Sequence, residues 1–243
     1  MTTTAGVVFP YGLNRWAELL EYRTVRGRDV IARVATIMGV TLLVGVGTAL
    51  LGPAVGTWKG VALYTVVILG GVPPAGVMEG VRHAASNTSM PGTRGEQIAV
   101  LLRLRQLLQR LLAAVGSLVA LWTLVFGAGA ALLRSLPAGS EYSGLNQAPP
   151  QAVLVFGGAG SLVVALFYIP AATALQRRGQ SLCDDLFPLT EAEEASAILS
   201  LAEDRHKLEQ LLGVDRGVIA DLQTGLAILG PLLASAATAF LSP

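Results

Sequence analysis

Four stretches within the first 175 residues carry no charged side chain, and each is about as long as a membrane span. They cover residues 34–52, 60–78, 111–133 and 152–175. A helix over 111–133 would rise roughly 34 Å at about 1.5 Å per residue, more than a hydrocarbon core of about 30 Å. A water-soluble protein seldom contains so long an uncharged helix, because at least one face would meet water. The pattern therefore predicts an all-α, polytopic membrane protein with four transmembrane helices.

Helical periodicity continues beyond the third and fourth of these stretches. Apolar residues recur three and four positions apart over 96–110, and no helix breaker separates this segment from 111–133. We therefore expect one helix over 96–133 and a second that runs from residue 152 to about Phe187. Both helices would extend past the membrane on the same side and pack there as an antiparallel stem.

A separate amphipathic helix is expected over 190–213. Thr190 and Glu193 have the spacing of a capping box, and Gly213 is typical of a helix C-terminus. The segment 222–241 is uncharged but rich in Ala, Ser and Thr. A fifth span, a re-entrant helix and a helix on the membrane surface all remain open for it.

The N-terminal residues 12–33 have the pattern of an amphipathic helix at the headgroup level, with an ordinary polar lead-in as the alternative. The chain thus divides into three parts. Residues 1–33 form a cytoplasmic or interfacial segment, and residues 34–175 form the four-helix transmembrane domain. Residues 176–243 combine the cytoplasmic amphipathic helix with a membrane-associated C-terminal helix.

Charged residues are few and unevenly placed. They make up 14% of the chain, against about 25% in ordinary soluble domains, and the mean hydropathy is +0.60. Of the 17 Lys and Arg residues, fifteen fall on the N-terminal side of the expected membrane and two on the opposite side. Since Lys and Arg favour the cytoplasmic side, we expect a multi-pass protein of the inner (plasma) membrane with a cytoplasmic N-terminus. The excess of Arg over Lys suggests a bacterial source, and the net charge of +1 indicates no nucleic-acid partner.

Prolines and glycines mark the expected bends and close contacts within the spans. Pro73 and Pro74 lie inside the second span, where proline removes a backbone donor, so we expect a kink or a break that could serve as a gate. Small residues at helical spacing let helices approach closely in lipid. The glycines expected to pack in this way are Gly39, Gly45, Gly157, Gly158 and Gly160.

No constellation of residues indicates a catalytic, cofactor or metal site. His83 and His206 lie outside the spans, and no acid or cysteine forms a metal-ligand set around either of them. The single cysteine, Cys183, rules out an intrachain disulfide. The adjacent Asp184 and Asp185 are a weak candidate for holding Mg²⁺ and a diphosphate.

Salt bridges offer a simpler interpretation of the two aspartates. Arg103 or Arg105 on the facing helix would pair with Asp184 or Asp185, and these four residues could also form a surface for a cytoplasmic partner. At the head of the tail segment, Asp221 and Gln223 could line a pore mouth, or they could cap or solvate that helix.

Three functional hypotheses follow. The first is a non-enzymatic homo-oligomer that forms a pore or a membrane-perturbing assembly controlled from the cytoplasmic side. It depends on the small-residue packing faces and on the Pro73–Pro74 pair. The second is a membrane anchor or accessory subunit whose stem docks a cytoplasmic protein, with Arg103 and Arg105 in the contact. The third is a Mg²⁺-dependent lipid-modifying enzyme that uses Asp184 and Asp185.

Overall fold

The computed structural model describes residues 9–15, 28, 30–39, 41, 58–87, 92–134, 150–188 and 194–214. Within these ranges the backbone is helical apart from short turns and contains no strand, so the predicted all-α fold class is confirmed. Residues 9–15 and Val30–Gly39 are helical. The longer helices are α3 (Trp58–Ser86), α4 (Arg94–Arg134), α5 (Pro150–Leu186) and α6 (Ala195–Leu212).

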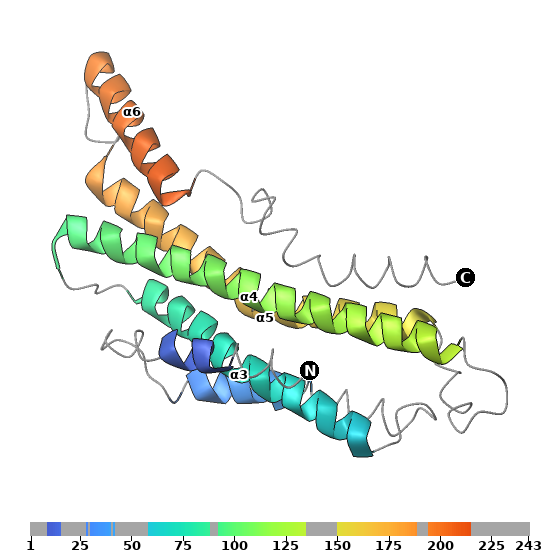
Figure 1. Cartoon of the computed structure of the whole chain (residues 1–243). Coiled ribbons are helices and arrows are strands. Elements are labelled where there is room, and N and C mark those ends of the chain that lie inside the picture. The colour runs from blue at the N-terminus through green and yellow to red at the C-terminus, as the bar shows by residue number, and fades with distance from the viewer. Residues whose placement is uncertain are drawn as a thin grey trace.

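The molecule is arranged around a long antiparallel pair, α4 and α5 (Figure 1). α4 has 41 residues and α5 has 37. At about 1.5 Å per residue the two helices reach roughly 60 Å and 55 Å, close to twice a hydrocarbon core. The predicted continuity of 96–133 and of 152 to about Phe187 is confirmed, and each helix begins two residues earlier than expected.

The earlier start of α4 has a local cause. The backbone N–H of Thr93 donates to Glu96 Oε2 at 2.7 Å, and the backbone N–H of Glu96 donates to Thr93 Oγ1 at 3.4 Å. This reciprocal pair is a capping box, which satisfies donors that the first helical turn leaves free. Gly92 precedes it with φ of +116°, a backbone conformation that glycine adopts without strain.

Two contacts fix the register of α4 against α5. Arg94 Nη1 lies 3.4 Å from Asp185 Oδ2 at one end. Further along, the backbone of α5 at Gly160 comes so close to Val119 that a Cβ there would collide with the valine side chain. Twenty-five residues separate Arg94 from Val119, and the same number separate Gly160 from Asp185. The two helices therefore pair without interruption over this distance.

α3 packs against α4 and α5 and carries both prolines. It continues as one helix through Pro73 and Pro74, so a break at this position, as considered from the sequence, does not occur. Both prolines are buried, and Gly12 of the helix 9–15 packs directly against them, because a Cβ at Gly12 would lie 2.8 Å from Pro73 Cβ. The Pro73–Pro74 pair thus forms the surface against which the helix 9–15 packs. The gating role of the two prolines stays a prediction.

The N-terminal amphipathic helix expected over 12–33 lies only partly within the described residues. Its described beginning, in the helix 9–15, leaves Phe9 and Leu13 exposed one turn apart. The Val30–Gly39 helix covers its end, with Val30 and Val34 buried. Residues 16–27 and 29 lie outside the described part.

Two of the described helices are long and apolar enough to cross a membrane, where the sequence predicted four. They are Arg94–Gly129 within α4 and Gly157–Leu186 within α5. The expected span 60–78 lies in α3, whose side chains are described only from Leu69 onward. Most of the expected span 34–52 lies outside the described residues.

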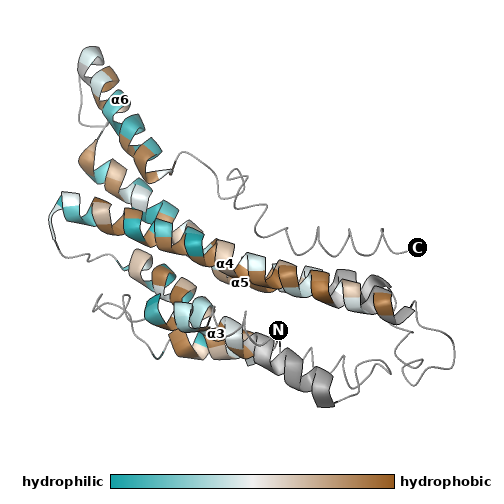
Figure 2. Ribbon diagram, viewed as in Figure 1, coloured by the Kyte–Doolittle hydropathy of each residue, from teal (hydrophilic) through white to brown (hydrophobic). Residues whose placement is uncertain are grey.

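Burial divides the α4–α5 pair into two halves. We call residues 94–112 of α4 and 176–186 of α5 the stem. In the stem, Leu101, Leu104 and Leu108 are buried together with Leu182, in agreement with the predicted antiparallel stem. In the other half, large apolar side chains remain 44–66% exposed, and Figure 2 shows this part of the pair as predominantly hydrophobic; they are Leu121, Leu124, Leu132, Leu162, Leu166 and Ile169.

α6 begins at Ala195, later than the 190–213 pattern predicted. Glu194 occupies the N-cap position but makes no side-chain hydrogen bond to the helix, and Thr190 and Glu193 lie outside the described residues. The predicted end at Gly213 is confirmed. α6 lies at the stem end of the molecule, beside the last turns of α5 (Figure 1).

Candidate functional site

Hydrophilic residues of the described part gather toward the end of the bundle where α3 ends and α4 begins (Figure 2). They form two clusters that hold different helices together. The Glu79 cluster consists of Glu79, Arg33, Arg82 and His83. The stem-tip cluster consists of Arg94, Asp184, Asp185, Arg205 and Glu209.

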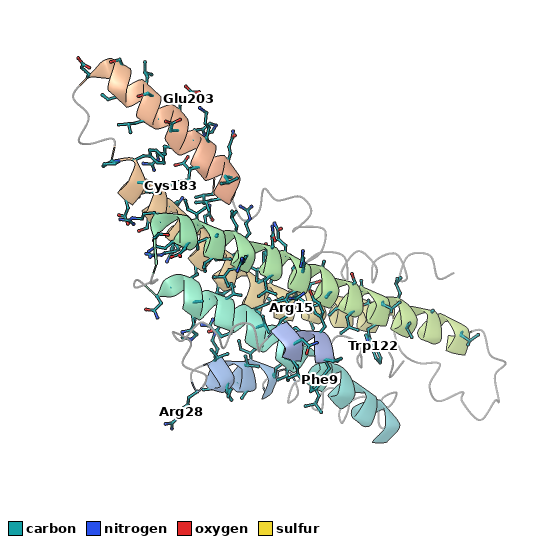
Figure 3. All side chains as sticks on the ribbon, turned by 60° about the vertical axis from the view of Figure 1, so that its left-hand side comes forward. Phe9, Arg15, Arg28, Trp122, Cys183 and Glu203 are labelled. Carbon is teal, nitrogen blue, oxygen red and sulfur yellow. The ribbon has the colours of Figure 1, made fainter. Side chains whose placement is uncertain are left out.

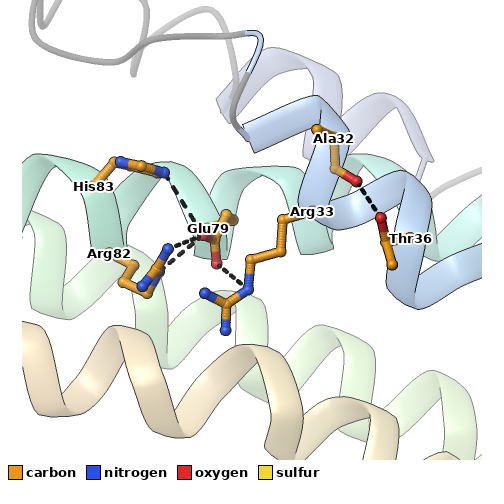
Figure 4. Close-up of polar contacts among 6 residues, drawn as sticks. All are labelled: Ala32, Arg33, Thr36, Glu79, Arg82 and His83. Atoms are coloured by element: carbon orange, nitrogen blue, oxygen red, sulfur yellow. Dashed lines mark hydrogen bonds and ion pairs between the residues drawn. The ribbon is translucent and has the colours of Figure 1, made fainter.

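The Glu79 side chain is only 1% exposed and has three basic neighbours (Figure 4). Arg82 Nη2 lies 2.6 Å from Glu79 Oε1, and Arg82 Nε donates to the same oxygen at 2.8 Å. Arg33 Nε lies 3.6 Å from Oε2, and His83 Nε2 lies 3.7 Å from Oε1. Arg33 belongs to the Val30–Gly39 helix, so the cluster joins that helix to α3 through a buried carboxylate.

The sequence contained a local signal for part of this cluster. Arg82 and His83 follow Glu79 by three and four residues, a spacing that places all three side chains on one helix face. The sequence-based prediction missed this contact of His83 with Glu79. No local signal identified Arg33, because it lies 46 residues away and reaches Glu79 only through tertiary packing.

At the stem tip, both aspartates have arginine partners other than the predicted ones. Asp185 pairs with Arg94 at 3.4 Å, and Asp184 Oδ1 lies 2.7 Å from Arg205 Nη2 of α6. Arg205 also reaches Glu209 one turn further along α6, at 2.8 Å. The predicted pairing of Asp184 or Asp185 with Arg103 or Arg105 is thus wrong, although the prediction that salt bridges engage these aspartates is correct.

Arg105 instead completes the C-terminus of α6. Gly213, in the left-handed conformation at φ +61°, donates its N–H to the Gln210 carbonyl, and Val214 donates to the Glu209 carbonyl. This pair of bonds is a Schellman motif. It leaves the Leu212 carbonyl free, and Arg105 Nη1 donates to it. A cation at this position is also favoured by the helix dipole.

α5 supplies the other side of this junction. The Gln176 amide donates to the Val214 carbonyl at 3.3 Å. Gly179 of α5 leaves room for the Val214 side chain, because a Cβ at Gly179 would lie 2.6 Å from Val214 Cγ2. The end of α6 is therefore held from two helices at once, by Arg105 of α4 and by residues of α5.

Cys183 lies within this junction, completely buried, and Figure 3 shows it on α5 near α6. Burial raises the pKa of the Cys183 thiol above its ordinary value, Glu209 raises it further, and Arg205 partly opposes the shift. The hydrogen bond to Glu209 raises the pKa of Arg205, so this guanidinium stays charged. A buried thiol with a raised pKa reacts slowly with alkylating reagents, because the thiolate is the nucleophile.

Replacing Gly213 with alanine is expected to release α6. A left-handed conformation costs a non-glycine residue roughly 1–2 kcal/mol, and a Cβ at Gly213 would collide with the Arg105 guanidinium. About 1.4 kcal/mol corresponds to a factor of ten in an equilibrium constant, so the state in which α6 is released is expected to be roughly ten times more populated. Alkylation of Cys183 by a water-soluble maleimide at neutral pH is therefore expected to accelerate roughly tenfold.

Gly95→Ala is the matched control for this experiment, because a Cβ at Gly95 would meet nothing within 4 Å and the backbone there is helical. Its alkylation rate is expected to equal that of the wild type. Equal rates for Gly213→Ala and Gly95→Ala would contradict the role assigned to the Gly213 junction.

The remaining site residues predicted from the sequence are dispersed. Arg103 is exposed on the stem. A Cβ at Gly39 would meet nothing within 4 Å, whereas Gly160 sits directly against Val119. Gly157 is buried and Gly158 half-buried. Gly45, Asp221 and Gln223 lie outside the described residues, so their packing and pore-mouth roles stay predictions.

Within the described ranges, no group of three or more His, Cys, Asp or Glu side chains is placed to hold a metal ion. The arrangement at both clusters is that of ion pairs joining helices, with cationic groups in excess around Glu79. Comparisons with models of protein families, with curated proteins and with solved structures find no match for this chain.

Proposed function

We propose that the chain is an integral membrane protein that anchors a helical stem at the cytoplasmic face of the bilayer. The observation that supports this most directly is the exposure of apolar side chains in one half of the α4–α5 pair. Only 41% of the apolar window of α4 and 33% of that of α5 are buried, whereas the core helix of a soluble protein is mostly buried. Exposing these apolar surfaces to water would cost free energy, whereas in a bilayer lipid would cover them.

We propose four spans, with residues 60–78 of α3 and residues 34–52 completing the set; of the latter, only 34–39 and 41 lie within the described residues. Residues 60–78 of α3 carry no charge, and α3 packs along both α4 and α5. We expect the uncharged part of α3 to lie at the same depth as the apolar halves of these two helices. Leu69 of α3 is 55% exposed, as a lipid-facing residue would be. The arginines at the stem end support the cytoplasmic placement of that end.

The proposed role of the stem is to dock an acidic surface of a cytoplasmic protein. Arg103 and Arg110 are both exposed on α4, and their separation of seven residues places them on one helix face. Arg105, expected from the sequence to share this role, instead holds α6. The pore hypothesis, which depends on the small-residue packing faces, on the Pro73–Pro74 pair and on the tail segment outside the described residues, stays a prediction.

Charge reversal of the exposed arginines tests the docking role. Arg103→Glu/Arg110→Glu is expected to abolish chemical crosslinking to the partner in native membranes, because opposite charges would become like charges across the contact. Arg177→Glu, at an exposed arginine of α5, is the matched control and is expected to crosslink as the wild type does. Crosslinked products that are the same for all three proteins would reject docking through this face.

A further inference from the structure

We infer that the Glu79 cluster binds the phosphate group of an anionic phospholipid. This inference rests on the membrane location proposed above and names a ligand for a site that the stem does not use. The cluster brings two guanidinium groups and an imidazole to a single carboxylate. One negative charge balances only one of the two arginines, so the cluster carries a surplus positive charge even with His83 neutral.

Exposure determines which groups an incoming ligand meets. The Arg33, Arg82 and His83 side chains are 37%, 28% and 29% exposed, whereas Glu79 is 1% exposed. The buried carboxylate therefore orients the basic groups from the protein interior. The donors of these groups that do not bond to Glu79 remain accessible on the protein surface. Figure 4 shows the Arg33 and Arg82 guanidinium groups close to one another beside Glu79. Arginine offers several donors in a planar fork, which matches the oxygens of a phosphate.

The position of the cluster along α3 favours a lipid as the source of the phosphate. Glu79 follows the uncharged residues 60–78 directly, so it lies where this helix passes from its apolar part to its charged end. In a bilayer, phosphate headgroups occupy this level. Basic pockets between helices on the cytoplasmic side of a membrane are recognised sites for anionic lipid headgroups.

Such a lipid would also bridge two elements of the chain. Arg33 comes from the Val30–Gly39 helix, while Arg82 and His83 come from α3. A phosphate bound by both arginines would therefore tighten the attachment of the N-terminal helix. The Glu79 cluster differs in this respect from the stem tip, where each aspartate has an arginine partner and the ion pairs join the helices directly.

Native mass spectrometry of the full chain in a neutral detergent tests the inference. Short-chain phosphatidylglycerol, short-chain phosphatidylcholine and inorganic phosphate are added separately. We expect phosphatidylglycerol to bind more tightly than phosphatidylcholine, and Arg33→Gln to weaken phosphatidylglycerol binding about fivefold, since one arginine near a membrane surface contributes about that factor. Lys207→Gln, at an exposed lysine of α6, is the control and is expected to leave binding unchanged.

Glu79→Gln separates binding from a purely structural role. This variant keeps the size of the side chain and removes the negative charge that competes with the ligand, so phosphatidylglycerol binding is expected to be at least as tight as in the wild type. Weaker binding by Glu79→Gln would overturn the inference. Equal binding of both lipids, or binding of inorganic phosphate without preference for phosphatidylglycerol, would overturn it as well. Retention of the protein in membranes after alkaline carbonate washing would show that the membrane location itself still holds.

Discussion

Replacing Arg82 with leucine is expected to lower the free energy of unfolding by about 3–5 kcal/mol, the range observed when one partner of a buried ion pair is removed. Glu79 is 1% exposed, and Arg82 is its nearest partner at 2.6 Å. In the variant the carboxylate would stay buried with only Arg33 and His83, at 3.6 and 3.7 Å, to balance it. Unfolding of the detergent-solubilised protein by a denaturing surfactant measures the loss.

A second substitution in the same background distinguishes lost charge balance from lost packing. Glu79→Gln/Arg82→Leu removes the buried charge as well as its partner, so it is expected to be more stable than Arg82→Leu alone. The effects would be additive if the double variant were less stable than Arg82→Leu by the same free energy of unfolding that Glu79→Gln alone removes from the wild type. The buried ion pair would then contribute nothing through charge.

Arginine in place of Leu121 is expected to prevent stable membrane insertion of α4. Leu121 lies near the midpoint of 111–133 and is 46% exposed. If this surface faces lipid, arginine at the centre of the span costs about 2.5–3.5 kcal/mol on the insertion scale. Most of the variant is therefore expected in the soluble or aggregated fraction after alkaline carbonate washing, whereas the wild type stays in the membrane pellet.

The same substitution on α6 provides the control. Leu199 is 73% exposed and lies outside the proposed spans, so Leu199→Arg is expected to stay in the membrane pellet like the wild type. Equal retention of Leu121→Arg and Leu199→Arg would show that Leu121 does not face lipid. The membrane assignment of α4 would then fail.

The long helices could be predicted because each follows from residues that are neighbours in the sequence. An unbroken run of three- and four-residue spacings, without proline, defined α4 from 96 onward, and Pro188 limited α5. Even the first two residues of α4 had a local signal in Thr93 and Glu96, whose spacing is that of a capping box. Periodicity is reliable here because backbone hydrogen bonds within a helix are local.

The partners of Asp184, Asp185 and Arg105 could not be predicted because they depend on the register between helices. With Arg94 opposite Asp185, Arg105 lies eleven residues further along α4. This displacement is about 16 Å, well beyond the reach of a salt bridge from the α5 aspartates. Arg105 is instead level with the end of α6, where it meets Leu212. Patterns within one helix contain no information about such an offset.

The uninterrupted course of α4 has a mechanical consequence. No proline interrupts it between Arg94 and Arg134, and its stem half is roughly 28 Å long. A rigid rod of this kind works as a lever. A tilt of about 10° in its apolar half moves Arg94 by about 5 Å, and Arg105 carries the same rotation to the end of α6. With the apolar half of α4 in a bilayer, as proposed above, a change in bilayer thickness that tilts this helix would be relayed to α6.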